Sequence, residues 1–136
     1  MDTAKRSCII SLSSILTAAV LSSGAASADG SSFPTYSSDF KSRSMSECLA
    51  IKGISTDLCD CIIATSDKMT ENDPVLFLFL ESERDRSKGI ALIKSIVDGD
   101  VYNSHNFTSR KEKAEFVEGK ARLFVYRFEK ACDAIH

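Results

Sequence analysis

The chain of 136 residues lacks the short motifs that mark most catalytic and phosphate-binding sites. It contains no G-x-S-x-G, no H-E-x-x-H and no glycine-rich phosphate loop. Histidine is scarce, since only His105 and His136 occur, and neither has a spacing that completes a zinc site with the cysteines. We therefore expect a protein that is not an enzyme and that carries no metal or cofactor.

An excess of charge of one sign is also missing, because 17 basic residues face 19 acidic ones. This balance gives no electrostatic reason for binding nucleic acid or an anionic membrane. Long apolar runs are absent too: the uncharged stretch 8–21 has 14 residues, and a bilayer span needs about 20. We expect no nucleic-acid partner and no stable insertion into a membrane.

The first 28 residues have the three parts of a secretory signal peptide. Lys5 and Arg6 form a basic start, residues 8–21 form the apolar part, and Ala26-Ser27-Ala28 is an A-x-A cleavage site. We predict a Sec-type signal cleaved after Ala28 and a periplasmic or secreted protein, with a bacterial periplasm favoured. Cleavage would leave 108 residues with 15 basic and 18 acidic side chains, a net charge of −3.

Four of the five cysteines remain after such a cleavage, because Cys8 leaves with the signal. The remaining cysteines are Cys48, Cys59, Cys61 and Cys132. An even number of cysteines in a short exported chain predicts a set of structural disulfides.

The mature chain divides into a flexible leader and one helical domain. Residues 29–43 are rich in serine, with glycine and proline, and show no period. Residues 44–136 show almost no strict alternation and no repeat. The fold class expected is all-α, a small bundle of four or five helices stapled by two disulfides. Helices are predicted over about 45–52 and 57–69, from 73 onward with an exposed stretch or a break in 81–88, over 90–97, and over 110 to about 134.

Capping patterns support these helices. Ser44 with Glu47 suits a capping box, Thr56 is a candidate cap, and Asp73 followed by Pro74 is a strong start. The run Val75–Leu80 fits a buried strand by itself, but the start signal favours a helix. Ser109 with Glu112 caps the last helix, whose expected buried stripe is Val117, Ala121, Phe124, Phe128, Cys132 and Ile135.

The two cysteines of the C-x-C pair project about 200° apart on a helix. Cys59 and Cys61 are therefore expected to bond to different helices and not to each other. In an antiparallel pair formed by the first two helices, Cys48 lies four residues before Lys52 and Cys61 lies four residues after Asp57. Both would therefore be equally far from the connecting turn, which favours Cys48–Cys61 with Cys59–Cys132. The crossed pairing, Cys48–Cys59 with Cys61–Cys132, follows from one residue of slippage and stays open.

Two chemical alternatives depend on single features. The C-x-C pair could bind Cu(I) or exchange thiols, which would make the protein a periplasmic metal or redox carrier. The loop 98–108 holds His105 beside Ser104, with Asp98 and Asp100 nearby, which suggests a small hydrolase. A serine, a histidine and an aspartate in one loop do not by themselves make a triad.

The leading interpretation is a non-enzymatic protein-binding module. Its candidate partner-binding residues are Arg110, Lys111, Lys113, Phe116 and Tyr126. The three cations sit where the helix dipole disfavours positive charge, which indicates an acidic partner. The alternative is a plain solvated surface, with Glu112 and Glu115 as neighbours, and it is favoured over the partner. Phe116, Leu123 and Tyr126 lie off the main stripe, so they either pack against a neighbour or form an exposed docking surface.

Overall fold

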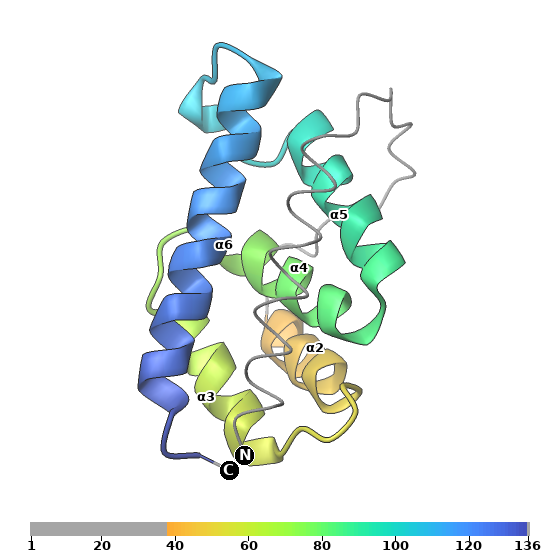
Figure 1. The fold of residues 1–136 in the computed structure, drawn as a ribbon, viewed down its shortest axis with the longest axis vertical. Helices are drawn as coiled ribbons and strands as arrows, with labels where there is room; N and C mark the ends of the chain where they lie inside the picture. The colour runs from red at the N-terminus through yellow and green to blue at the C-terminus, as the bar shows by residue number, and fades with distance from the viewer. Residues whose placement is uncertain (1–37, 136) are drawn as a thin grey trace.

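The computed structural model describes residues 38–135, and within this range it is all-helical, with no strand (Figure 1). This confirms the predicted fold class, an all-α bundle of four or five helices with two disulfides, and five α-helices are present in this range. The elements are α2 (Ser38–Leu49), α3 (Thr56–Asp67), α4 (Asp73–Arg84), α5 (Arg86–Asp98), a single 3-10 turn η1 (Asn103–His105) and α6 (Arg110–Cys132).

Helix α4 is the centre of the bundle and contacts each of the other four α-helices. Its six-residue apolar run, Val75–Leu80, is completely buried, which explains why the run shows no polar side. The helical interpretation of this run is confirmed. Helix α6 runs along one side of the molecule, and its C-terminal half lies beside α3, which points the opposite way (Figure 1).

Helix α2 begins at Ser38, six residues before the predicted cap at Ser44. Phe40, Ser44 and Cys48 recur every four residues and are all buried, so one continuous stripe faces the core. The Phe40 ring packs 5.6 Å from the Phe77 ring on α4. Residues 38–43 of the predicted leader are therefore helical, and residues 29–37 lie outside the described part of the chain.

The next helix begins close to its predicted start. Ser55, and not Thr56, is the N-cap of α3, and its hydroxyl accepts a hydrogen bond of 3.2 Å from the backbone N–H of Leu58. The turn before it contains Gly53, whose φ of +82° is a left-handed conformation that suits glycine.

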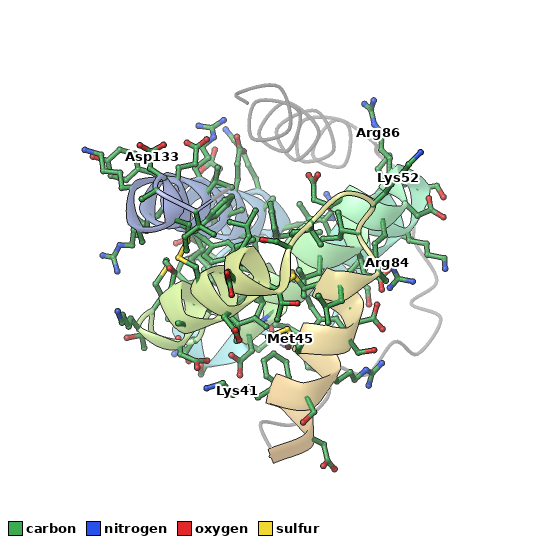
Figure 2. All side chains as sticks on the ribbon, turned by 90° about the horizontal axis from the view of Figure 1, so that it is seen from below. Lys41, Met45, Lys52, Arg84, Arg86 and Asp133 are labelled. Carbon is green, nitrogen blue, oxygen red and sulfur yellow. A yellow bond between two sulfur atoms is a disulfide. The ribbon has the colours of Figure 1, made fainter. Side chains whose placement is uncertain are left out.

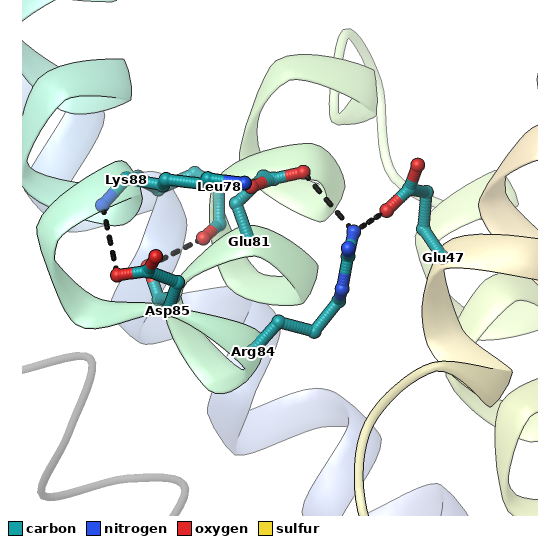
Figure 3. Close-up of polar contacts among 7 residues, drawn as sticks. Glu47, Leu78, Glu81, Arg84, Asp85 and Lys88 are labelled. Carbon is teal, nitrogen blue, oxygen red and sulfur yellow. Dashed lines mark hydrogen bonds and ion pairs between the residues drawn. The ribbon is translucent and has the colours of Figure 1, made fainter.

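The polar stretch 81–88 contains a break at one residue, Asp85, which ends α4 and caps α5. Its backbone N–H donates to the Glu81 carbonyl, and its carboxylate accepts from the N–H of Ser87. The same carboxylate accepts from the N–H of Lys88 (Figure 3). Hydrogen bonds from the Ser87 hydroxyl and from the Lys88 N–H are the largest reasons for a lowered pKa of Asp85. The carboxylate is thus held in the charged form that a helix N-terminus favours.

Two contacts hold the elements on either side of this break. Arg84 lies between Glu81 on its own helix and Glu47 on α2, and forms ion pairs with both (Figure 3). Gly89 on α5 lies against Ser82, where an added Cβ would stand 2.4 Å from the serine hydroxyl and 2.9 Å from its Cα. Only glycine permits this approach of α5 to α4 without displacement.

Helix α6 follows its predicted cap and stripe. The Ser109 hydroxyl accepts from the backbone N–H of Glu112, and the Glu112 carboxylate accepts from the N–H and hydroxyl of Thr108. The predicted stripe is buried from Val117 to Cys132, and Ile135 is partly buried. The Phe79 ring of α4 packs 5.7 Å from the Phe124 ring and 5.1 Å from the Phe128 ring.

Candidate functional site

Two disulfides join the helices at one end of the bundle, Cys48–Cys59 and Cys61–Cys132, with Cα–Cα distances of 5.8 and 5.9 Å (Figure 2). The prediction that the C-x-C pair serves two different helices is confirmed. The favoured pairing, Cys48–Cys61 with Cys59–Cys132, is wrong, and the crossed pairing is the one formed. The reason is that α2 ends at Leu49 and not at Lys52, which places Cys48 nearer the turn and level with Cys59.

The two bridges have different surroundings. Cys48 and Cys59 are both fully buried, whereas Cys61 is only partly buried, opposite a fully buried Cys132. The hydroxyl of Thr65 lies 4.0 Å from the Cys132 sulfur. In this oxidised form neither sulfur of the C-x-C pair is a thiolate, the form that binds Cu(I) or attacks a disulfide.

An aromatic cluster occupies the other end of the molecule, where the loop 99–109 meets the start of α6. The His105 ring lies 4.6 Å from the Phe116 ring and 5.8 Å from the Phe107 ring. The Tyr102 ring lies 5.2 Å from Phe116, and the Lys120 ammonium stands 5.7 Å from the centres of both rings. Phe116, a candidate partner-binding residue, is therefore partly covered by its own loop.

Polar contacts join this loop to the α3–α4 connection. The Tyr102 hydroxyl donates to the Glu71 carbonyl at 2.7 Å, and His105 Nε2 lies 2.7 Å from a Glu71 carboxylate oxygen. Burial raises the pKa of the Tyr102 phenol, and the Glu71 and Asp73 charges act in the same direction, so the phenol stays a neutral donor. Lys120 donates to the Thr70 carbonyl at 2.6 Å.

The three non-glycine residues with positive φ among residues 38–135 all lie in these two connections. Glu71, Tyr102 and Asn106 have φ values of 50°, 65° and 53°. A left-handed conformation costs about 1–2 kcal/mol for an ordinary residue. The contacts of Glu71 with Tyr102 and His105 offset this strain, so the loop conformation depends on them.

The arrangement around His105 does not complete a catalytic triad. Asp98 binds Arg110, and Asp100 accepts from Asn103 at 3.2 Å. The carboxylate beside His105 is Glu71, which is 34 positions away in the chain and which no motif in the sequence indicates. The geometry gives an oriented imidazole but shows no contact between it and Ser104.

The three basic residues at the start of α6 are bound to the chain itself. Lys113 is 4% exposed, and its ammonium donates to the Gly99 carbonyl at 2.6 Å and to Asn103 Oδ1 at 2.8 Å. Burial lowers the pKa of Lys113, while the Asp100 and Asp98 charges oppose that shift. Arg110 pairs with Asp98 at 2.5 Å, and Lys111 pairs with Glu115 at 3.7 Å. Lys113 thus anchors the loop and is not available to a partner, which corrects its place among the candidates.

The side of α6 that points away from the core carries a second set of candidates. Leu123 and Tyr126 are 44% and 56% exposed, three positions apart and therefore neighbours on the helix. We define the outer face of α6 as five of the exposed side chains in its C-terminal half, namely Arg122, Leu123, Tyr126, Arg127 and Lys130. Of the aromatic residues predicted to lie off the main stripe, only Tyr126 is on this face.

Comparisons of the chain with protein-family models, with curated proteins and with solved structures find no match in any of the three. In the described range, no helix has the length and apolar character needed to cross a membrane. Nor do residues 38–135 contain a group of three or more His, Cys, Asp or Glu side chains placed to hold a metal ion. The function is therefore argued from the residues themselves.

Proposed function

We propose that the protein is an exported, non-enzymatic protein-binding module of the bacterial envelope, with the outer face of α6 as its docking surface. Roles of this class include an immunity or inhibitor protein against a toxic hydrolase, an entry-exclusion factor, and an accessory subunit of a secretion or surface machine.

The observation that carries the proposal is the exposure of Leu123 and Tyr126 on a helix that cannot turn them inward. The opposite side of α6 is buried from Val117 to Cys132, and the last turn is covalently tied to α3 through Cys61. Single exposed apolar side chains are common on soluble proteins. Two large ones side by side on a fixed helix, one of them a tyrosine, resemble the anchors of a protein interface.

Export is supported by the disulfides, which are consistent with an oxidising location outside the cytoplasm. The predicted signal peptide falls on residues 1–28, which lie outside the described part of the chain. Its cleavage after Ala28 stays a prediction that mass spectrometry of the exported protein checks.

The alternative of a metal or thiol-redox carrier requires Cys59 and Cys61 as free thiols. Counting of titratable thiols on protein taken from its native compartment separates the two ideas, with none expected for a structural pair. Two or more free thiols would restore the carrier hypothesis. The hydrolase hypothesis requires His105. If that hypothesis is wrong, His105→Ala should leave the phenotype unchanged.

The proposed function is tested by affinity capture from envelope extracts with the oxidised protein as bait. A partner in stoichiometric amount is expected, and the double variant Leu123→Ala/Tyr126→Ala should recover much less of it. Since both side chains are exposed, this variant should fold with an unchanged circular dichroism spectrum. Capture of no stoichiometric partner under any growth condition would contradict the proposal.

A further inference from the structure

The outer face of α6 combines apolar anchors with charge of one sign. Between Gly119 and Lys130 the exposed side chains on this helix are Arg122, Leu123, Tyr126, Arg127 and Lys130, and none of them is acidic. The protein as a whole has a net charge of −2. A basic surface on an acidic protein therefore reflects local placement and not general composition.

Each anchor has a cation one helical turn away. Arg127 follows Leu123 by four positions, and Lys130 follows Tyr126 by four. The Lys130 ammonium stands 5.1 Å from the centre of the Tyr126 ring. On this face Arg122 pairs with Glu118, whereas no ion pair among residues 38–135 involves Arg127 or Lys130.

We infer that the outer face of α6 docks an acidic amphipathic helix of another protein, an inference that rests on the proposed function. Such a helix would pack apolar side chains on Leu123 and Tyr126 and set carboxylates beside Arg127 and Lys130. Gly119 has no side chain, and no atom lies within 4 Å of a Cβ added there. This position therefore leaves room for a bulky side chain of the partner at the edge of the contact. Complementary charge of this kind selects the partner and speeds the encounter.

A second copy of the chain fits this face poorly. A two-fold contact brings the same surface of both copies together. Centred on Leu123 and Tyr126, an antiparallel contact would set Arg122 of one copy near Arg127 of the other, and like charges would repel.

A shifted two-fold contact would instead use the acidic side chains of the N-terminal half of α6. Glu112 is already held by Thr108 at 2.6 and 2.7 Å, and Glu115 pairs with Lys111. Both carboxylates would have to leave these contacts before they could meet a second copy. A separate acidic chain needs no such exchange, so the observations favour it.

The test uses two labelled synthetic peptides of about 18 residues, long enough to form a helix in isolation. Both carry the same leucine stripe, one with glutamate and the other with lysine at the flanking positions. Binding to the oxidised protein is measured by fluorescence anisotropy. The glutamate peptide should bind at least about tenfold more tightly than the lysine peptide, and added salt should reduce the difference.

Two variants address the two halves of the inference separately. Arg127→Glu/Lys130→Glu should reverse the preference between the peptides. Leu123→Ala/Tyr126→Ala should weaken binding of the glutamate peptide by about tenfold or more. Equal affinity for both peptides, no binding of either, or binding that survives the loss of both apolar side chains would overturn the inference.

Sedimentation equilibrium tests whether a second copy of the chain occupies the outer face of α6. A concentration-dependent dimer that disappears in Leu123→Ala/Tyr126→Ala would overturn the acidic partner in favour of self-association. Stoichiometric capture of an envelope protein that is unaffected by Arg127→Glu/Lys130→Glu would overturn the acidic partner and leave the proposed function standing. Failure of both capture and peptide binding would remove the two together.

Discussion

The two ends of the bundle are held by different means. At the end where α6 finishes, covalent bonds fix α2, α3 and α6 through four cysteines, three of them fully buried. At the end where α6 begins, the loop 99–109 is held by hydrogen bonds, ion pairs and ring contacts, and residues with left-handed backbone lie in it. The covalent end therefore depends on an oxidising environment. The polar end depends on hydrogen bonds and ion pairs, which pH and salt affect.

The largest expected effect comes from removing the bridges. Replacing Cys61 and Cys132 by alanine frees a segment with a sequence separation of 71, against 11 for Cys48 and Cys59. Loop-closure entropy gives losses of about 4 and about 3 kcal/mol in the free energy of unfolding. Urea denaturation of both double variants measures them. A larger loss for the Cys48–Cys59 pair would show that its complete burial outweighs loop length.

At the opposite end the largest expected effect belongs to Lys113. Lys113→Met keeps the aliphatic stem but leaves the Gly99 carbonyl and Asn103 Oδ1 without their donor. The expected loss is about 2 kcal/mol in the free energy of unfolding. Lys111→Met is the matched control, because that side chain is 81% exposed and should change stability little. Equal effects of the two substitutions would remove Lys113 as the anchor of the loop.

A smaller effect is expected at Tyr102. Tyr102→Phe removes the hydrogen bond to the Glu71 carbonyl and keeps the ring contacts with Phe116 and His105. Thermal unfolding should show a loss of about 1 kcal/mol. Tyr126→Phe on the outer face of α6 provides the control and should leave stability unchanged. An unchanged stability of Tyr102→Phe would mean that the ring contacts alone hold the loop.

The smallest expected effect is a loss of folding stability at low pH. Hydrogen bonds from Thr108, the side chain first, lower the pKa of Glu112, and those from Ser87 and Lys88 lower that of Asp85. Carboxyl groups with a lowered pKa in the folded state stabilise it above their unfolded pKa. Stability should therefore decline as the pH falls below the unfolded values of 4.5 for Glu112 and 3.8 for Asp85.

This decline is measured by unfolding curves between about pH 6 and pH 2.5. Glu112→Gln and Asp85→Asn should each make the decline shallower. Burial raises the pKa of Asp73, with the Asp67 charge as a second cause, so its protonation opposes the decline. If stability declined as steeply in both variants as in the unsubstituted protein, the acid sensitivity would belong to other carboxyl groups.

The sequence predicted the covalent end and the helices better than the polar end. The C-x-C spacing alone indicated two separate partners, and Asp73-Pro74 and Ser109 marked helix starts that the structure confirms. The start of α2 was missed although its signal was present, since Phe40, Ser44 and Cys48 recur every four residues. The pairing of the cysteines depended on where α2 ends, and three residues of difference were enough to reverse it.

The contacts at the polar end could not be predicted because they join distant parts of the chain. Nothing near Glu71 or His105 in the sequence links the two, and their approach follows from the packing of α6 against the α3–α4 connection. The burial of Lys113 has the same origin. Three cations at a helix start fit a solvated or partner-binding surface, and only the folded loop shows that one of them turns inward.

The order of the bridges along the chain has a consequence for how the protein is oxidised. Among the four cysteines of residues 38–135, the first joins the second and the third joins the fourth. If the chain enters an oxidising compartment from its N-terminus, Cys48 is already in that compartment when Cys59 enters, whereas Cys132, the partner of Cys61, enters last. Each native pair then consists of two cysteines that enter one after the other. An oxidase that joins cysteines in their order of entry therefore produces the native disulfides, without rearrangement by an isomerase.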